Sequence, residues 1–430
     1  MNQHDKKLSK PLLYPSPSPL APPPCKPKIT LKVPSAISCS SQITGTVTCS
    51  GNPVNRATVK FESTSFSISP ISSVMTDRKG EFIADVDVIS GYPSTNISII
   101  ASTTVNNIPA STFANTVVEC LAPPPRNRIY VTHPNNDTVS VIDGSSNVVI
   151  AAIGVGDSPY QVAVNPVTNR IYVTHPNNGM VSVIDGLTNA LITAIPVNEF
   201  PERITVNPVT NRIYVTHREI NIISVVDGFT NTVIATLPLA SNQLVGITVN
   251  PVTNRIYASN FKIGVEQGSV IVIDGSSNAV IETIPVQLSS GIAVNSITNR
   301  IYAIRLDGPI LVIDGFTNTV ISSIRGASEA RFEIAVNPFH PFTNRVYVQG
   351  RTDDIEIKTI EVIDGTINRV IVKILTDFSS IDGIAVNSIT DRIYVIGQGA
   401  NKVSVIDGIT NTVISNIQVG NISGGVAVIP

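Results

Sequence analysis

Three histidines recur at a spacing of 42 residues, each directly after a Tyr-Val-Thr triplet: His133, His175 and His217. Carboxylates follow within the next segments, at Asp157, Glu199 and Glu202. Imidazole nitrogen and carboxylate oxygen are the usual protein ligands of zinc, so the pattern first suggests a metal site. Whether such side chains can meet depends on the elements that carry them.

The four cysteines, Cys25, Cys39, Cys49 and Cys120, all lie in the first 120 of 430 residues. No Cys-x-x-Cys pair is present and His4 is the only nearby histidine, so a zinc site is the least favoured interpretation. We expect disulfides or intermolecular cross-links in an oxidising compartment, with free thiols as the alternative. Four cysteines allow three pairings, and all three stay open.

Composition excludes several classes of protein. Hydrophobic residues make up 42% of the chain and charged residues 14%, which excludes a coiled coil or a disordered polyampholyte. The 29 basic and 31 acidic residues give no electrostatic footprint for nucleic acid. No apolar run is long enough to span a membrane, and prolines after Lys10 interrupt the run that a conventional signal peptide needs. Gly-x-Ser-x-Gly, His-Glu-x-x-His and phosphate-loop motifs are absent, and we predict no cofactor.

A repeat organises the chain from residue 127 onward. Asn-Arg-Ile-Tyr or a close variant begins seven times, 42 to 47 residues apart, at Asn127, Asn169, Asn211, Asn254, Asn299, Asn344 and Asp391. Four short strands per copy predict seven blades of a β-propeller over residues 127–430. The first copy lacks an inner strand, because Pro123–Pro125 cannot form one. We therefore expect residues 425–430 to pair with Asn127–Thr132 and to close the ring.

The repeat resembles the YVTN-type propeller repeat, which is related to NHL-type repeats, over about 300 residues. The resemblance rests on Tyr130-Val-Thr-His133 and its two successors, and on Val-Ile-Asp-Gly in six copies. Family repeats usually have Asn where the first three copies have His, and Asn260 keeps it in the fourth. The resemblance implies a surface, extracytoplasmic or binding protein and no particular reaction.

Most recurring side chains are interpreted as scaffold. Each copy has an arginine where the second strand begins and an aspartate where the third ends, and these ends meet in an antiparallel pair. We predict an Arg–Asp pair in every blade, and tyrosine wedges between blades.

The metal hypothesis fails on distance. Equivalent points on adjacent blades are about 10 Å apart, whereas zinc holds each nitrogen at about 2.0–2.1 Å. Surface histidines are therefore the favoured interpretation, with ligand contact as the alternative and a shared metal as the least favoured.

Function is expected on one face of the propeller. The turns between strands one and two and between strands three and four are nearly uniform, whereas the connections at the opposite face vary, as recognition surfaces do. The ligand-binding candidates on the varied face are His133, His175, His217, Asp157, Glu199, Glu202, Arg305, Glu329 and Arg331.

Residues 28–120 read as about seven short strands, which predicts a β-sandwich. Asp77–Gly80 is predicted to be a hairpin turn. The segments Gly51–Phe61 and Thr76–Phe82 resemble bacterial immunoglobulin-like modules of surface proteins. Residues 1–27 are predicted to form a Pro-rich disordered tail, and residues 121–126 a linker.

The predicted class is all-β: a Pro-rich tail, an immunoglobulin-like sandwich and a seven-bladed propeller. We expect a non-catalytic cell-surface or envelope protein whose propeller binds a protein, glycan or small ligand. Spore surface and cytoplasm are the alternative locations. The alternative functions are a lactonase-like propeller enzyme, with acidic metal ligands drawn from Glu199, Glu202, Glu329 and Asp377, and a cross-linked structural surface subunit.

Overall fold

The computed structural model is built of β-strands and forms two compact units, an N-terminal unit up to Glu119 and a C-terminal unit from Cys120 onward. The described part of the chain contains no helix that could span a membrane. The structure describes residues 26–33, 36–37, 40–63, 68–69, 73–88, 95–118, 127–239, 243–261, 268–286, 289–305, 308–325, 333–338, 344–351, 358–398, 400–420 and 424–430.

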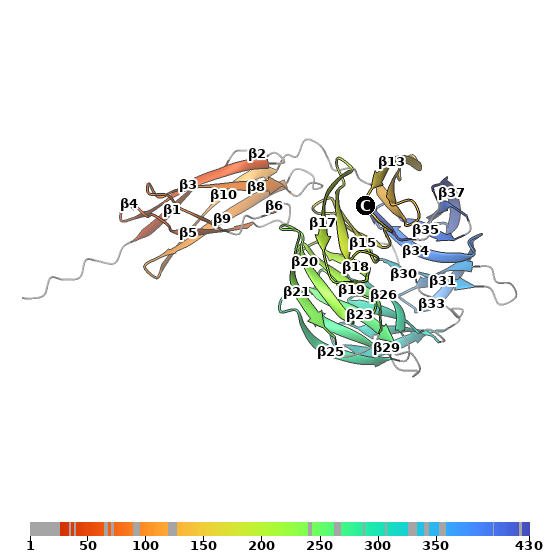
Figure 1. Cartoon of the computed structure of the whole chain (residues 1–430). Helices are drawn as coiled ribbons and strands as arrows, with labels where there is room; N and C mark the ends of the chain where they lie inside the picture. Colours follow the sequence, from red (N-terminus) through yellow and green to blue (C-terminus); the bar gives the residue numbers. More distant parts are fainter. Residues whose placement is uncertain are drawn as a thin grey trace, which may run out of the picture. The chain divides into compact units, whose positions relative to one another are not determined.

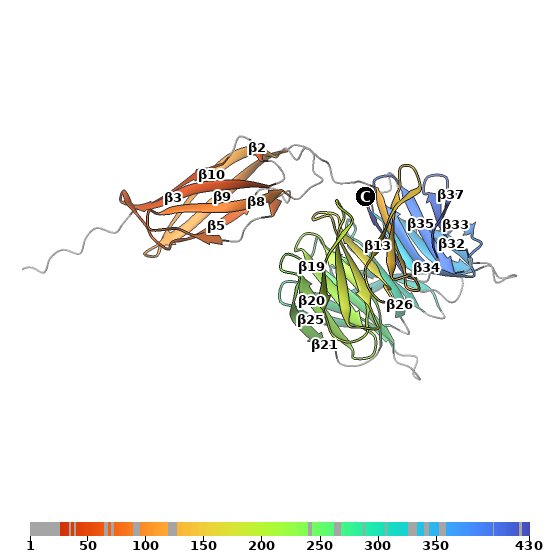
Figure 2. The same cartoon turned by 45° about the horizontal axis from the view of Figure 1, so that its top comes forward.

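Two five-stranded sheets make up the N-terminal unit (Figures 1 and 2). The first has the order β1-β3-β8-β6, with β4 paired to β3, and consists of β1 (Pro27–Lys32), β3 (Ser40–Cys49), β4 (Asn52–Pro53), β6 (Ile68–Ser69) and β8 (Glu81–Val88). The second has the order β2-β10-β9-β5-β7 and consists of β2 (Ala36–Ile37), β5 (Thr58–Ser63), β7 (Ser73–Met75), β9 (Thr95–Val105) and β10 (Ile108–Val118).

The two sheets bury alternate side chains against each other, which makes this unit a β-sandwich. Val47 and Phe82 of the first sheet are buried, as are Val59 and Phe61 of the second. The rings of Phe61 and Phe82 meet edge to face with centroids 5.7 Å apart. The order β1-β3-β8-β6 facing β10-β9-β5 matches the sheet order of an immunoglobulin-like sandwich.

Two local expectations differ from the structure here. Asp77–Gly80 is not a hairpin turn, because β7 pairs with β5 and β8 pairs with β3, so this turn carries the chain from one sheet to the other. The hairpin lies instead between β9 and β10, where Asn106 and Asn107 both have positive φ angles of 52° and 65°. Two such residues form the tight turn that matches strand twist, so both strands are longer than predicted.

Cys49, at the end of β3, is disulfide-bonded. Cys25, Cys39 and Cys120 lie outside the described residues, as does the Pro-rich segment of residues 1–25. Which cysteines pair therefore stays a prediction.

The C-terminal unit is a seven-bladed β-propeller of four-stranded antiparallel sheets (Figure 1). Blade 1 consists of β38 (Val426–Ile429), β11 (Arg128–His133), β12 (Thr138–Asp143) and β13 (Val148–Gly154); blade 2 of β14 (Val162–Asn165), β15 (Arg170–His175), β16 (Met180–Asp185) and β17 (Ala190–Pro196); blade 3 of β18 (Pro201–Asn207), β19 (Arg212–His217), β20 (Ile222–Asp227) and β21 (Thr232–Pro238); and blade 4 of β22 (Gln243–Asn250), β23 (Arg255–Phe261), β24 (Gly268–Asp274) and β25 (Ala279–Val286).

The remaining blades follow the same order from inner to outer strand. Blade 5 consists of β26 (Ser289–Asn295), β27 (Arg300–Arg305), β28 (Ile310–Asp314) and β29 (Thr319–Ile324); blade 6 of β30 (Ile334–Asn337), β31 (Arg345–Arg351), β32 (Lys358–Asp364) and β33 (Arg369–Leu375); and blade 7 of β34 (Ser380–Asn387), β35 (Arg392–Gln398), β36 (Lys402–Asp407) and β37 (Thr412–Gln418).

The C-terminal strand closes the ring as the sequence predicts. In blade 1, β38 pairs with β11 in the register Val426↔Val131 to Ile429↔Arg128. Neighbouring inner strands contact one another around the whole ring, from β38 through β14 to β34 and back to β38. The inner strands therefore surround a central channel. The connections between the strands of each blade lie at the two opposite ends of this channel.

We call these ends the turn face and the loop face. The turn face carries the turns that join strands one and two, and strands three and four, of each blade. The loop face carries the turns between strands two and three and the connections from one blade to the next. This assignment follows from the antiparallel order of the strands.

Seven tyrosines pack between blades, as predicted. Tyr130 of blade 1 is fully buried and packs against Ile171 and Val173 of blade 2, and Tyr394 of blade 7 packs against Ile129 and Val131 of blade 1. Successive strand residues point to opposite faces of a sheet, so each blade offers one row of side chains to each neighbour.

The predicted Arg–Asp pairs are only partly present. Arginine and aspartate lie opposite each other in register in all seven blades. In blade 6, Arg345 Nη1 lies 3.2 Å from Asp364 Oδ2. In blade 4, however, Arg255 Nη1 donates to the carbonyl of Gly315 in blade 5 at 2.6 Å. The aspartates instead cap their own turns: Asp227 Oδ1 accepts the amides of Phe229 and Thr230 at 2.8 and 2.9 Å.

Buried asparagines link one blade to the next. Asn165, at the end of β14, accepts the Val167 amide on Oδ1 at 3.0 Å and donates from Nδ2 to Asn211 Oδ1 of blade 3 at 2.7 Å. Equivalent amide bonds join blades 3 and 4, blades 4 and 5, and blades 7 and 1. Asn211, which accepts this bond, lies close to the Asp227-Gly228 turn. A Cβ atom on Gly228 would lie only 2.5 Å from Asn211 Oδ1.

Candidate functional site at the channel mouth

The three recurrent histidines are buried, so the expectation of surface histidines is wrong. His133, His175 and His217 are 2%, 1% and 0% exposed. Each lies in the second strand of its blade and faces the preceding blade. Their Nε2 atoms lie 2.8–2.9 Å from the hydroxyls of Ser140, Ser182 and Ser224 in the third strand.

Two of these histidines also hold the connection that enters their own blade. His175 Nδ1 lies 2.7 Å from the carbonyl oxygen of Asp157, and His217 Nδ1 lies 2.7 Å from that of Glu199. A carbonyl only accepts, so Nδ1 carries the proton and donates. Burial lowers the pKa of both imidazoles below the usual 6.5, against these hydrogen bonds, which raise it.

The threonine before each histidine fixes the next blade. Thr132 Oγ1 donates to the carbonyl of Tyr160 in blade 2 at 2.6 Å, and Thr174 Oγ1 donates to that of Glu202 in blade 3 at 3.0 Å. Tyrosine, threonine and histidine of the repeat thus have three positioning roles: a wedge, a clamp on the next inner strand, and a clamp on the incoming loop. These contacts hold the starts of β14 and β18 at the loop-face end of the channel.

An ion pair crosses the channel at this end. Arg203 Nη1 of blade 3 lies 2.8 Å from Glu333 Oε1 of blade 6, and the two side chains are 21% and 16% exposed. Blades 3 and 6 are three steps apart in a ring of seven, so the pair spans the channel between nearly opposite inner strands. Burial alone would lower the pKa of Arg203, but the charge and hydrogen bond of Glu333 raise it overall.

Other polar groups surround this pair. Glu202 Oε2 lies 3.6 Å from Arg218 Nε, and the Arg218 side chain is 57% exposed. Burial raises the pKa of Tyr160, whose hydroxyl lies in the field of Arg203 and Glu202. We call the following set of residues the channel mouth: Tyr160, Glu202, Arg203, Arg218, Glu333 and Asp382. It offers cationic and anionic groups and a phenol within one partly shielded opening.

Asp382 brings blade 7 into the same cluster. Burial raises the pKa of its carboxyl group, and the nearby charge of Glu333 adds to the increase. Hydrogen bonds from Ser380 and Gln398 act in the opposite direction. The Ser380 hydroxyl donates to Asp382 Oδ1 at 3.0 Å.

The predicted site residues are dispersed. Glu202 lines the channel mouth, while Asp157 and Glu199 are exposed on blade-to-blade connections and contribute backbone carbonyls to the histidines. Arg305, half-buried at the end of β27, occupies the position that histidine has in blades 1 to 3. Glu329 and Arg331 lie outside the described residues.

Sequence reasoning missed Arg203, Glu333, Tyr160 and Asp382. One signal was present: Arg203 and Glu333 hold the same position of the repeat, directly before Ile-Thr-Val-Asn207 and Ile-Ala-Val-Asn337, where four other copies have glycine. The sequence does not show that these two opposite charges, 130 residues apart, meet across the channel. Within the described ranges, no three His, Cys, Asp or Glu side chains are grouped so that they could hold a metal ion.

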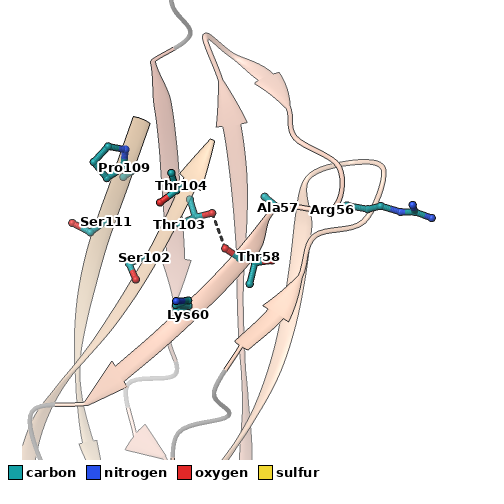
Figure 3. Close-up of a pocket in the computed structure, with 10 residues that line it drawn as sticks. Arg56, Ala57, Thr58, Lys60, Ser102, Thr103, Thr104, Pro109 and Ser111 are labelled. Atoms are coloured by element: carbon teal, nitrogen blue, oxygen red, sulfur yellow. Dashed lines mark hydrogen bonds between the residues drawn. The ribbon is translucent and has the colours of Figure 1, made fainter. Parts of the chain in front are cut away.

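A second depression lies on the sandwich. A pocket of about 780 Å³ lies over β5, β9 and β10 and is lined by Thr58, Lys60, Ser102, Thr104 and Ser111, among others; Figure 3 shows these lining residues. Below it, Thr103 Oγ1 donates to the Thr58 carbonyl at 2.8 Å. Its walls are hydroxyl-rich, and among the described residues that line it the charged ones are Lys60 and Arg56. Both are cations, so they do not form the pairing of opposite charges found at the channel mouth.

The fold defines a β-propeller protein, and comparison with solved structures agrees. No protein-family model matches the chain, and no curated protein is similar to it in sequence. A functionally unknown protein from Desulfotomaculum acetoxidans superposes with a TM-score of 0.58 at 13% identity, over 70% of this chain and 98% of that one.

Two further structures have lower scores. Hydrazine synthase of Kuenenia stuttgartiensis has a TM-score of 0.43 at 16% identity, over 69% of this chain and 85% of that one. The dihydro-heme d1 dehydrogenase NirN has a TM-score of 0.49 at 12% identity, over 68% of this chain and 64% of that one.

Proposed function

We propose that this chain is a non-catalytic binding protein of the cell surface or envelope, with a propeller of the YVTN type. Its channel mouth and the surrounding loop face bind a polar ligand: a glycan, a polar segment of a protein, or a small molecule. The observation that supports this most directly is the convergence of Arg203, Glu333, Glu202 and Tyr160 from three blades.

The architecture supports binding more than chemistry. Donors and acceptors of both charges are held by rigid inner strands, and preorganised polar groups at the end of a concave opening are typical of ligand sites. Partial burial strengthens their electrostatic interactions with a ligand. Arg218, which is 57% exposed, is the cation of this set that a ligand reaches first.

The proposed location has separate support. Structural disulfides persist in oxidising environments, and Cys49 is disulfide-bonded in the sandwich. A surface protein in which the sandwich is the spacer and the propeller is the recognition unit is consistent with this disulfide and with an oxidising environment. The test is protease treatment of intact cells and spores, with mass spectrometry of the released peptides. Full protection of propeller peptides in both would overturn the surface location.

The binding proposal is tested with the purified full chain on a glycan array and on fractionated envelope proteins. Arg218→Met and Tyr160→Phe should reduce any binding at least severalfold, because they remove one charge and one hydroxyl without changing packing volume. Ile83→Ser, 61% exposed on β8 of the sandwich, is the control and should leave binding unchanged. Binding that survives Arg218→Met and Tyr160→Phe, or is lost with Ile83→Ser, would contradict the proposed site. Metal analysis of the same preparation, combined with a lactone hydrolysis assay, tests the lactonase-like alternative.

A further inference from the structure

The turns of the turn face and the outer strands that follow them carry most of the exposed large apolar side chains of the described residues. Among the described residues, all but five of these side chains lie in its turns or in the outer strands that lead from them; the exceptions are Met75, Ile83, Phe200, Ile220 and Leu375. In the turns, Phe316 is 74% exposed, Phe229 56%, Val252 74% and Ile389 71%. The uniform face, expected to be plain scaffold, is therefore the apolar one.

Turn chemistry does not require these side chains to be apolar. In the Asp-Gly turns the capping aspartate binds the amide of the residue after glycine, which leaves that side chain pointing outward. Asp314 Oδ1 accepts the Phe316 amide at 2.9 Å, and Asp143 Oδ1 accepts the Ser145 amide at 3.0 Å. Serine thus builds the same turn in blade 1 that phenylalanine builds in blade 5. An exposed phenylalanine where serine suffices indicates a contact surface.

The outer strands continue this surface. In every blade the pairing of strands three and four shifts register, so that one residue of the outer strand bulges. The bulged residue is an isoleucine in all seven blades, for example Ile234 at 45% and Ile321 at 47% exposure. Bulges disfavour edge-to-edge strand pairing, so this rim offers side chains rather than backbone to a partner.

The charges of the turn face favour a second copy of the chain over an anionic membrane as the partner. Each blade places one arginine opposite one aspartate at this end, so the face alternates both signs and has no excess of either. An anionic membrane surface would require an excess of positive charge. A second copy, turned about a two-fold axis, would instead meet a surface that is apolar and balanced like its own.

The available area is sufficient. Nine turn residues are at least half exposed, and a side chain of this size removes roughly 60–120 Å² from water when fully buried. Together they offer on the order of 500 Å² of apolar surface. A standard interface buries about 800 Å² on each partner, of which somewhat more than half is apolar, so the two values agree.

We propose that two copies of this chain associate through their turn faces into a two-fold dimer, with the loop faces directed outward. This contact lies at the opposite end of the channel from the proposed ligand site. The dimer would therefore direct its two channel mouths away from each other, so that it could bridge two separate ligands but would gain no avidity on a single flat surface.

The test is sedimentation analysis of the full chain over a range of micromolar concentrations. The wild type should sediment with twice the monomer mass of 45.7 kDa. Phe229→Ser combined with Phe316→Ser introduces the residue that blade 1 already has, and should raise the dimer Kd at least a hundredfold because each change occurs twice. Leu375→Ser, 62% exposed at the loop-face end of β33, is the matched control and should leave Kd unchanged.

Three outcomes would overturn the proposal. The first is a monomeric wild type at the highest concentration, and the second is a dimer that resists both serines yet dissociates with Leu375→Ser. The third is a monomer that floats with neutral phosphatidylcholine vesicles and loses flotation with the two serines, which would make the partner a membrane. Near-UV circular dichroism of each variant checks that the propeller is folded.

Discussion

Two buried asparagines allow the blade-to-blade amide bond to be measured. Asn387 of blade 7 and Asn295 of blade 5 are both fully buried, and both cap the same type of turn. Asn387 Oδ1 accepts the Ile389 amide at 3.0 Å, and Asn295 Oδ1 accepts the Ile297 amide at 2.9 Å. Replacing either residue by leucine removes the cap and keeps the number and branching of the side-chain heavy atoms, so the added volume is the same at both sites. The two sites differ in the hydrogen bonding of the side-chain Nδ2 group.

At Asn387 the Nδ2 group donates to Asn127 Oδ1 of blade 1 at 2.9 Å, whereas the Nδ2 group of Asn295 is buried without a partner. Asn387→Leu therefore loses a bond worth about 0.5–1.5 kcal/mol. The cost stays near this range because Asn127 Oδ1 keeps the hydroxyl of Tyr394 at 3.1 Å. Asn295→Leu loses no such bond and removes an unsatisfied donor. We expect Asn387→Leu to cost about 1–2 kcal/mol more free energy of unfolding.

The assay is thermal unfolding followed by near-UV circular dichroism. The chain has no tryptophan, and seven of its ten tyrosines are buried between blades, so this signal reports on the propeller. A difference of 1–2 kcal/mol corresponds to roughly 2–6 °C in Tm. Equal losses of Tm in the two variants, or a larger loss for Asn295→Leu, would refute the reasoning that the inter-blade bond stabilises the ring.

Three other predictions concern closure, pH and the channel. Deleting Gly425–Pro430 should lower the free energy of unfolding of the propeller by at least about 5 kcal/mol, because Val428 and Ile429 are removed from the core and β11 loses its inner partner β38. An unchanged Tm would contradict the closure by β38. The pKa values of His175 and His217 are lowered in the folded protein, so below about pH 6.5 the unfolded chain binds more protons and the free energy of unfolding should fall with decreasing pH. The double variant His175→Asn with His217→Asn introduces the residue that blade 4 has as Asn260. In denaturant titrations between pH 7.5 and 5, its free energy of unfolding should depend less steeply on pH than that of the wild type. An equal slope would count against a role of these two histidines. Glu333→Gln should lower the free energy of unfolding by about 1–3 kcal/mol, since Arg203 loses its charged partner in a shielded channel. Glu202→Gln should lower it by less than about 0.5 kcal/mol, because Arg218 is solvated. Similar Tm values for the two variants would show that the channel does not shield the Arg203–Glu333 pair.

The propeller could be predicted from the sequence because its information is local and repeated. Each copy carries its own turn residues, its own alternation of apolar side chains and its own tyrosine, so seven similar segments predict seven similar sheets. Closure was predictable for a related reason: one copy lacked an inner strand, and an inner strand without a copy was left at the end of the chain. The sandwich was less predictable, since only pairing partners distinguish a hairpin at Asp77–Gly80 from a crossing between sheets.

The site depended on tertiary structure. His133, His175 and His217 have the residue type of ligands, but burial and the carbonyl and hydroxyl groups around them make them clamps. Arg203 and Glu333 come together only because closing seven blades into a ring brings the third inner strand opposite the sixth. Spacing along the chain determines which strands form, because strand pairing within a blade is local. Which side chains share an opening is decided by how far each one reaches across the closed ring, and the local pattern does not encode this.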